Sequence, residues 1–169
     1  MIEARTRSAD DTRALAAALA ELARPGDLLL LAGELGAGKT AFAQGFGAAL
    51  GVAEPITSPT FTLASQYSGR LELNHLDVYR LEQLTEVLDI GLPEMLDEGG
   101  VTLVEWGDSI VAALPADYLL IRMRYGDGDD DRLLSIEPVG SAWAARSRAM
   151  SLALTVWRDP AAGPEDPTC

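Results

Sequence analysis

The sequence has very few cysteine, histidine and lysine residues and no long apolar run. Among 169 residues there is one cysteine, one histidine and one lysine. The cysteine is Cys169, the last residue, so a disulfide within the chain is excluded and nothing indicates an oxidising compartment. No apolar run approaches the roughly 18 residues that a membrane-spanning helix needs, and the longest clear one covers residues 28–32. Residues 1–7 lack the apolar stretch of a signal peptide, so we expect a cytoplasmic protein without a membrane partner.

Positive charge is also scarce. Thirteen lysine and arginine residues stand against 26 aspartate and glutamate residues, which gives a formal net charge of −13. Proteins that hold nucleic acid by neutralising its phosphates need a basic face, and anionic membrane surfaces attract basic segments. The composition therefore argues against both as main partners, although a small basic site on an acidic body is compatible with it. Twelve of the thirteen basic residues are arginine and the exception is Lys39, which matters because the two side chains are not interchangeable.

The remaining composition is that of an ordinary globular protein, with 48% hydrophobic and 23% charged residues. The length corresponds to about one domain, and no repeat or long linker divides it. Strands alternate with helices in the first part of the chain and pair with one another later. This pattern predicts a single-domain α/β fold with a mixed central sheet flanked by helices. We expect the domain over residues 1–158 and a proline-rich, disordered tail over residues 159–169.

Local patterns place the elements of this fold. Short apolar runs between turn residues predict strands, and longer runs rich in helix formers predict helices. An acidic loop at residues 126–131 lacks the ligand spacing of a calcium loop and indicates a solvated hairpin turn. Strands are expected at residues 28–32, 62–67, 71–79, 101–104, 118–125 and 132–138. Helices are expected at residues 10–23, 40–50, 81–88, 110–114 and 141–156, and residues 91–100 are expected to be irregular.

Residues 33–40 form the most informative motif. They read Gly-Glu-Leu-Gly-Ala-Gly-Lys-Thr and match the phosphate-binding loop G-x-x-x-x-G-K-[ST] in full. Backbone N–H groups of such a loop surround phosphate oxygens, and the following helix adds the positive end of its dipole. The apolar strand before the motif and the helix after it favour this function over a glycine-rich turn that only caps a helix. The residues expected to contact the nucleotide are Gly33, Glu34, Leu35, Gly36, Ala37, Gly38, Lys39, Thr40 and Ala41, with Lys39 on the β- and γ-phosphates and Thr40 on Mg²⁺.

Acidic residues downstream complete the predicted site. Glu105 ends the apolar run 101–104, the place where such proteins carry an acid that holds Mg²⁺ directly or through water. His75, Asp77 and Tyr79 alternate with apolar residues, so they share one face of a strand. Asp77 can orient or activate an attacking water, the alternative being a hydrogen-bonded network that braces the sheet. For His75 catalysis and bracing remain equally open.

Two further segments have both a functional and a structural interpretation. Ser58, Pro59 and Thr60 follow the loop's helix, where nucleotide-sensing segments usually lie, so Thr60 can sense the γ-phosphate; the alternative is a turn fixed by the proline. Trp106 follows Glu105 directly. It either packs at the rim of the core or lies near the nucleotide or a partner.

Together these motifs resemble the TsaE family, the small bacterial ATPases of tRNA threonylcarbamoyladenosine (t6A) biosynthesis. The resemblance rests on residues 33–40, 58–63, 75–80 and 103–106 and covers roughly residues 8–140. It implies ATP binding with Mg²⁺, slow hydrolysis by the chain alone, and association with the proteins TsaD and TsaB, of which TsaD carries the transferase chemistry. It further implies that ATP turnover resets this complex, and that tRNA is reached only through it.

The resemblance also implies roles for individual residues. The start of the first helix would lie near the nucleotide base, which points to Asp11 or Thr12. The sequence departs from the family at Glu34, where aspartate is usual, and in its proline-rich tail; neither change removes a part of the mechanism. The implied site is Lys39 on phosphate, Thr40 and Glu105 on Mg²⁺, Asp77 as the acid linked to hydrolysis, and Ser58, Pro59 and Thr60 as the switch-like segment.

Other nucleotide-binding functions remain alternatives. A small-molecule kinase would need an acceptor pocket and an arginine-rich lid, and no segment after the loop gathers arginines in that way. A GTPase is disfavoured because residues 74–77, Asn-His-Leu-Asp, lack the lysine of the guanine-reading motif and precede the Glu105 strand. An adaptor that binds nucleotide without hydrolysing it would share every binding residue.

Overall fold

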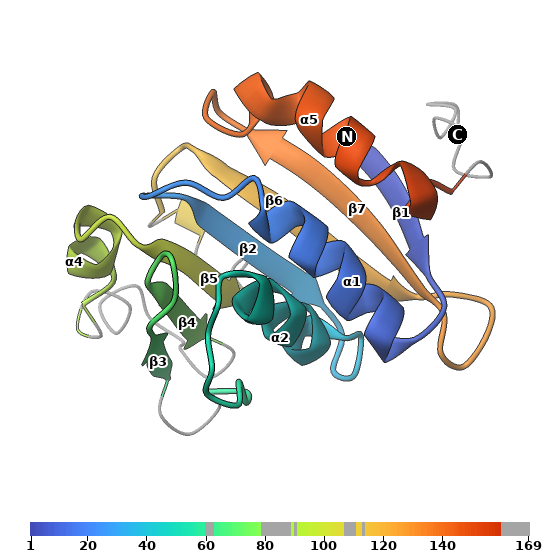
Figure 1. The fold of residues 1–169 in the computed structure, drawn as a ribbon, viewed down its shortest axis with the longest axis horizontal. Coiled ribbons are helices and arrows are strands. Elements are labelled where there is room, and N and C mark those ends of the chain that lie inside the picture. The colour runs from blue at the N-terminus through green and yellow to red at the C-terminus, as the bar shows by residue number, and fades with distance from the viewer. Residues whose placement is uncertain (60–62, 79–88, 90, 107–110, 113, 160–169) are drawn as a thin grey trace.

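The computed structural model describes residues 1–59, 63–78, 89, 91–106, 111–112 and 114–159. Its described strands form one sheet in the order β1-β7-β6-β2-β5-β4-β3, with helices packed against it (Figure 1). The strands are β1 (Ile2–Thr6), β2 (Leu28–Gly33), β3 (Ala64–Tyr67), β4 (Leu73–Asp77), β5 (Val101–Glu105), β6 (Tyr118–Tyr125) and β7 (Arg132–Val139). The helices are α1 (Ala9–Ala20), α2 (Lys39–Ala49), α4 (Leu92–Asp97) and α5 (Ser147–Ala153), with 3₁₀ turns at Ala144–Arg146 and Thr155–Trp157.

The centre of the sheet is parallel and its margins are antiparallel. β2 lies between β5 and β6 and runs parallel to both, and β4 runs parallel to β5. β3, β7 and β1 add antiparallel pairs. The carboxyl ends of β2, β4 and β5 therefore meet at one edge of the sheet, where ligands bind in open α/β folds.

The unbroken leucine run of β2 is explained by burial on both faces. Leu29 and Leu31 join the larger hydrophobic cluster, which also contains the inner faces of α1 and α2. Leu28 and Leu30 join a second cluster on the opposite face. A strand in this position has no solvent-facing side, so it lacks the alternation of a half-exposed strand.

Helices α1 and α2 lie side by side over the same face of the sheet (Figure 1). The Ser8 side chain caps α1 by accepting a hydrogen bond from the Asp11 backbone, and the buried positions of the helix recur at helical spacing. The two helices approach closely at Gly45, where a Cβ would lie 2.1 Å from the carbonyl oxygen of Arg13. Gly45 therefore allows α2, the helix that follows the loop, to pack closely against α1.

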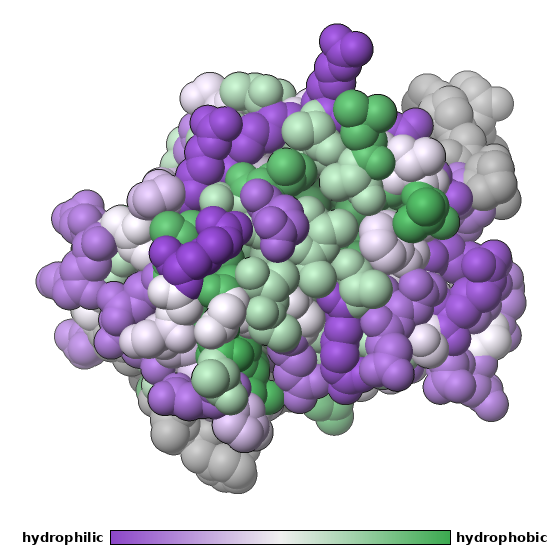
Figure 2. Space-filling view, viewed as in Figure 1, coloured by the Kyte–Doolittle hydropathy of each residue, from purple (hydrophilic) through white to green (hydrophobic). Residues whose placement is uncertain are grey.

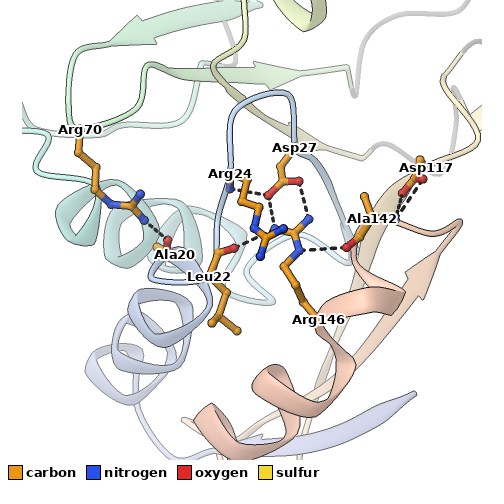
Figure 3. Close-up of polar contacts among 8 residues, drawn as sticks. All are labelled: Ala20, Leu22, Arg24, Asp27, Arg70, Asp117, Ala142 and Arg146. Carbon is orange, nitrogen blue, oxygen red and sulfur yellow. Dashed lines mark hydrogen bonds and ion pairs between the residues drawn. The ribbon is translucent and has the colours of Figure 1, made fainter.

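A buried ion pair joins the C-terminal segment to the start of β2. Both terminal nitrogens of Arg146 lie 2.6 Å from the Asp27 carboxylate, and the Arg146 guanidinium also donates to the carbonyls of Leu22 and Ala142 (Figure 3). Its carbon lies 3.9 Å from the ring centre of the buried Trp143. Every charge in this cluster is thus paired and hydrogen-bonded, as a buried ion pair requires.

Asp117 ties the beginning of the same C-terminal segment to β6. Its carboxylate accepts a hydrogen bond from the backbone N–H of Ser141 and another from that of Ala142, the second of which is drawn in Figure 3. These bonds, chiefly the one from Ser141, lower the pKa of Asp117 below its ordinary value because they stabilise the ionised form. The carboxylate therefore contributes to stability at neutral pH.

The predicted α/β fold with a mixed sheet and flanking helices is confirmed. Helices and strands around the phosphate loop lie where they were expected, and β6 has exactly the predicted bounds. Residues 126–131 close the β6–β7 hairpin as predicted. The predicted helix at residues 81–88, the residue Tyr79 and the tail from residue 160 lie outside the described residues. The assignment of a tail beginning at residue 159 therefore stays a prediction.

Three expectations were wrong in detail. Residues 91–100 are not wholly irregular, because Gly91 and Pro93 start the short helix α4. The single helix expected at 141–156 is a 3₁₀ turn, the short helix α5 and a second 3₁₀ turn. The helix expected at 10–23 ends at Ala20. The strand β1 was not predicted at all, because its charged residues Glu3 and Arg5 conceal an edge strand that pairs with β7.

The face formed by α1, α2 and α5 is mixed in character (Figure 2). Apolar side chains lie along its centre and hydrophilic ones surround them. Leu152 and Val156, which are 70% and 80% exposed, belong to the C-terminal segment on this face. Among the described residues, no helix is both long and apolar enough to cross a membrane.

Candidate nucleotide site

The predicted phosphate loop joins the end of β2 to the start of α2. Gly33 has φ +149°, and a Cβ there would lie 2.4 Å from the Met123 carbonyl oxygen, so a larger residue would collide with β6. Gly36 has φ +78°, a conformation that side chains disfavour. The glycines at these two positions are therefore required by the path of the loop itself.

Lys39 is buried inside this loop. It is 5% exposed, and its Nζ donates to the carbonyl oxygens of Gly33 and Glu34 at 2.7 and 2.8 Å. The same nitrogen lies 3.9 Å from the ring centre of Trp106. These partners are neutral, and an ammonium binds an anionic oxygen more strongly than a neutral one. Lys39 thus occupies the position from which a phosphate can displace the loop carbonyls.

Two carboxylates lie beside the loop at the same edge of the sheet. Asp77 ends β4 and Glu105 ends β5, and the two residues are paired in the parallel register. Glu105 is also paired with Leu31 of β2. Paired residues in a parallel ladder point to the same face, and Leu31 faces α1 and α2. Both acids therefore belong to the face that carries the loop and α2, and they are 5% and 3% exposed.

His75 holds one of these acids. Its Nε2 lies 2.8 Å from Oε1 of Glu105, and both side chains are buried. This contact supports the bracing interpretation of His75, since an imidazole that donates to a carboxylate fixes the orientation of that carboxylate. Of the two open interpretations, the structure thus favours the one in which His75 acts through Glu105.

The oxygen groups at this edge suit Mg²⁺ with a nucleotide. Mg²⁺ prefers hard oxygen ligands and is usually bound by one or two carboxylates together with substrate phosphates. Glu105 and Asp77 supply carboxylates, and Thr40 supplies a hydroxyl from the first turn of α2. Within the described residues, no group of three or more His, Cys, Asp or Glu side chains forms a self-sufficient metal site. The donor set therefore fits an ion that arrives with phosphates.

The segment predicted to sense the nucleotide is connected to Asp77. Pro59 is buried and its carbonyl accepts a hydrogen bond from Leu63 N–H, while Ser58 is exposed. Leu63 has φ +63°, and its carbonyl accepts a bond from the Asp77 N–H at 2.9 Å. A change in this turn would therefore reach the backbone of Asp77. Thr60 lies outside the described residues, so its role stays a prediction.

Trp106 adopts a strained conformation at the site. Its φ is +64°, in a region that costs a residue with a side chain about 1–2 kcal/mol. Its backbone N–H donates to the Leu31 carbonyl, and its ring lies against the Lys39 ammonium. Such outliers are concentrated at functional sites. The structure therefore places Trp106 in the candidate site and not only in the rim of the core.

Asp11 has partners within the protein. One carboxylate oxygen accepts from Trp157 Nε1 at 2.6 Å and the other from the Arg7 backbone at 2.9 Å. The bond from Trp157 connects α1 to the C-terminal segment. Its neighbour Thr12 approaches the loop, because its methyl lies 3.9 Å from a Cβ built at Gly38. Contact of either residue with a nucleotide base stays a prediction.

The sequence did not indicate two residues that contact the loop. Tyr125 and Arg132 stand opposite each other in the β6–β7 hairpin and donate hydrogen bonds to the carbonyls of Leu35 and Gly36. The separations along the chain are 90 and 96 residues. Only the pairing of β6 beside β2 could have revealed them.

Comparisons with known proteins agree with this geometry. A family model described as "Threonylcarbamoyl adenosine biosynthesis protein TsaE" matches residues 6–134. The chain belongs to the TsaE family. A protein of Bacillus subtilis named tRNA threonylcarbamoyladenosine biosynthesis protein TsaE is 44% identical over 140 residues, which cover 82% of this chain and 87% of the relative. A protein of the same name from Treponema pallidum is 44% identical over 119 residues, 70% of this chain and 88% of the relative.

The fold of this TsaE-family chain also matches a solved structure. The crystal structure of YdiB from Bacillus subtilis superimposes with a TM-score of 0.77 at 36% sequence identity, and the match covers 90% of this chain and 97% of YdiB. The motifs on which the resemblance rested lie within the matched region 6–134. The recognition of the family from four short motifs is therefore confirmed.

Proposed function

We propose that this chain binds ATP with Mg²⁺ at residues 33–40 and hydrolyses it in support of t6A biosynthesis. The observation that carries the proposal is the meeting of three features at one edge of the sheet. These are the glycine-rich loop, the buried ammonium of Lys39 and the paired carboxylates of Asp77 and Glu105. The names of the relatives supply the biosynthetic context.

Each residue has a defined part in the proposed reaction. Backbone N–H groups of the loop and the start of α2 receive the phosphates, and Lys39 exchanges the carbonyls of Gly33 and Glu34 for phosphate oxygens. Thr40 and Glu105 hold Mg²⁺, which neutralises charge on the β- and γ-phosphates when it is bound. Asp77 orients the attacking water and accepts its proton. His75 keeps Glu105 in place.

The nucleotide cycle is proposed to act on a protein complex. In this proposal the chain works in the cytoplasm with TsaD and TsaB, and ATP turnover resets the transferase complex between cycles. With a net charge of −13, the chain itself is a poor partner for tRNA. Contact with tRNA therefore occurs through the complex.

Phosphate release tests hydrolysis and partner dependence together. We expect slow release by the chain alone and faster release after purified TsaD and TsaB are added. Equal rates indistinguishable from zero in both mixtures would contradict hydrolysis and leave a nucleotide-dependent adaptor. Transfer of labelled γ-phosphate to a small molecule instead of water would favour the kinase alternative.

Replacing Asp77 by asparagine separates binding from turnover. Asp77→Asn keeps the size of the side chain but cannot accept a proton from water, so we expect phosphate release to fall at least about a hundredfold. ADP affinity, measured by calorimetry, is expected to change little because Lys39 and the loop are intact. Asp97→Asn removes an exposed acid at the end of α4 and serves as the matched control. Normal turnover by Asp77→Asn would assign Asp77 to bracing the sheet.

A further inference from the structure

The β6–β7 hairpin donates two side-chain hydrogen bonds to the phosphate loop. The Tyr125 hydroxyl donates to the Leu35 carbonyl at 2.7 Å, and the Arg132 guanidinium donates to the Gly36 carbonyl at 3.3 Å. The guanidinium carbon of Arg132 lies 4.5 Å from the centre of the Tyr125 ring, close enough for a cation–π interaction. The last residue of β6 and the first of β7 thus form one unit against the loop.

These two bonds give side-chain donors to two loop carbonyls other than those bonded to Lys39. The carbonyls of Gly33 and Glu34 accept from Lys39, and those of Leu35 and Gly36 accept from the hairpin. A phosphate would draw Lys39 away from its two carbonyls, because an ionised oxygen is the stronger acceptor. The hairpin bonds do not compete with the ligand in this way. They are the ones that can hold the loop both before and after binding.

A donor on a carbonyl also fixes the N–H on the other side of the same peptide unit. The unit is planar and trans, so its C=O and N–H point in opposite directions. The Tyr125 bond orients the N–H of Gly36. The Arg132 bond fixes the next peptide unit, whose Ala37 N–H donates to the Glu34 carbonyl at 3.1 Å. Hydrogen bonds in such chains also polarise one another, and Arg132 adds a positive charge behind the loop.

Gly36 leaves room for the Tyr125 hydroxyl on the loop side. A Cβ built at Gly36 would lie 2.6 Å from the Tyr125 hydroxyl oxygen. At Gly38 a Cβ would lie 3.2 Å from the Met123 side chain and 4.0 Å from that of Arg132. Residues of the hairpin therefore line the loop along two of its glycines.

We infer that Tyr125 and Arg132 are positioning residues that pre-orient the N–H of Gly36 toward a bound phosphate, Tyr125 through the Leu35 carbonyl and Arg132 through the neighbouring peptide unit. They act through the loop and not on the nucleoside. The inference rests on the proposed function, because it concerns the same loop. Its ligand chemistry is that of a polyphosphate chain.

The test compares ADP with inorganic tripolyphosphate, two ligands that have only a polyphosphate chain in common. Tyr125→Phe removes the hydroxyl and keeps the ring that Arg132 contacts. We expect its affinity for both ADP and inorganic tripolyphosphate, measured by calorimetry, to fall about three- to tenfold, the value of one hydrogen bond. Arg132→Gln is also expected to lower the affinity for both ligands. Hydrogen exchange at the Gly36 amide should be faster in both variants without nucleotide.

Controls on the same hairpin separate positioning from folding. Tyr118→Phe makes the same change at the other end of β6, and Arg124→Gln removes an exposed guanidinium from β6; both should bind as the wild type does. The inference is overturned if Tyr125→Phe binds tripolyphosphate with normal affinity. It is likewise overturned if the variant loses affinity for ADP alone, because the hairpin would then contact the nucleoside. It is also overturned if a lower unfolding temperature accounts for the lost binding. If the wild type binds neither ligand, the proposed function itself fails.

Discussion

Lys39→Ala is expected to weaken the binding of ATP and ADP by at least about a hundredfold. Lys39 is the chain's only lysine, and its ammonium is already desolvated inside the loop. It would exchange two neutral carbonyls for charged phosphate oxygens, and each hydrogen bond to a charged group contributes about 1.5–3 kcal/mol. Two such contacts correspond to the stated loss of affinity. Calorimetric titration with Mg²⁺ and nucleotide measures the effect.

Two comparison variants make this result specific. Arg148→Ala removes one positive charge from an exposed position in α5 and should leave affinity unchanged, which separates a local contact from the overall charge. Lys39→Arg should not restore binding, because a planar guanidinium does not fit a site shaped for a compact ammonium. Full affinity in Lys39→Ala would mean that the loop does not receive the phosphates. Circular dichroism of each variant establishes that it is folded.

Arg146→Ala is expected to lower the free energy of unfolding by about 3–5 kcal/mol. The substitution leaves the Asp27 carboxylate buried without its ionic partner, which is the costly way to break an internal ion pair. It also removes hydrogen bonds to the Leu22 and Ala142 carbonyls and the contact with the Trp143 ring. For a domain of this size the loss corresponds to a fall in unfolding temperature of about 10 °C. Urea and thermal unfolding both measure it.

The pair can be examined further by replacing both members. The double variant Asp27→Leu with Arg146→Met removes both charges together and should recover much of the lost stability. Arg5→Ala is the matched control, because its pairing with Asp127 and Asp131 is partly exposed and such pairs contribute little. If Arg146→Ala were as stable as Arg5→Ala, the buried pair would have no net structural value. Nucleotide affinity of the folded variant should stay normal, because the pair lies at the start of β2 and the loop at its end.

The parts of the site that were predictable are local in sequence. The order of apolar run, glycine-rich loop and helix within residues 28–50 is determined by neighbouring residues, so β2 and α2 were found with nearly correct bounds. Glu105 was identifiable because it ends a short apolar run, and Asp77 because it alternates with apolar residues near the end of a predicted strand. Their exact pairing in the register became known only from the sheet.

The parts that were missed depend on contacts between distant segments. Arg146 and Asp27 are 119 residues apart, and nothing near either residue marks it as buried. β1 reads as a polar N-terminal segment until β7 lies beside it. The contacts of Tyr125 and Arg132 with the loop likewise require β6 to lie next to β2. The side chains of the candidate site could therefore be predicted from motifs, whereas those that hold them in place could not.

Titration of the wild-type chain with ATP in the presence of Mg²⁺ tests the central claim most directly. We predict measurable heat of binding with one nucleotide bound per chain. We also predict that inorganic tripolyphosphate binds with measurable heat and competes with ATP, because both ligands bind the same loop. Absence of heat with either ligand, from protein that unfolds cooperatively and is therefore folded, would contradict nucleotide binding at residues 33–40 and with it the proposed ATPase.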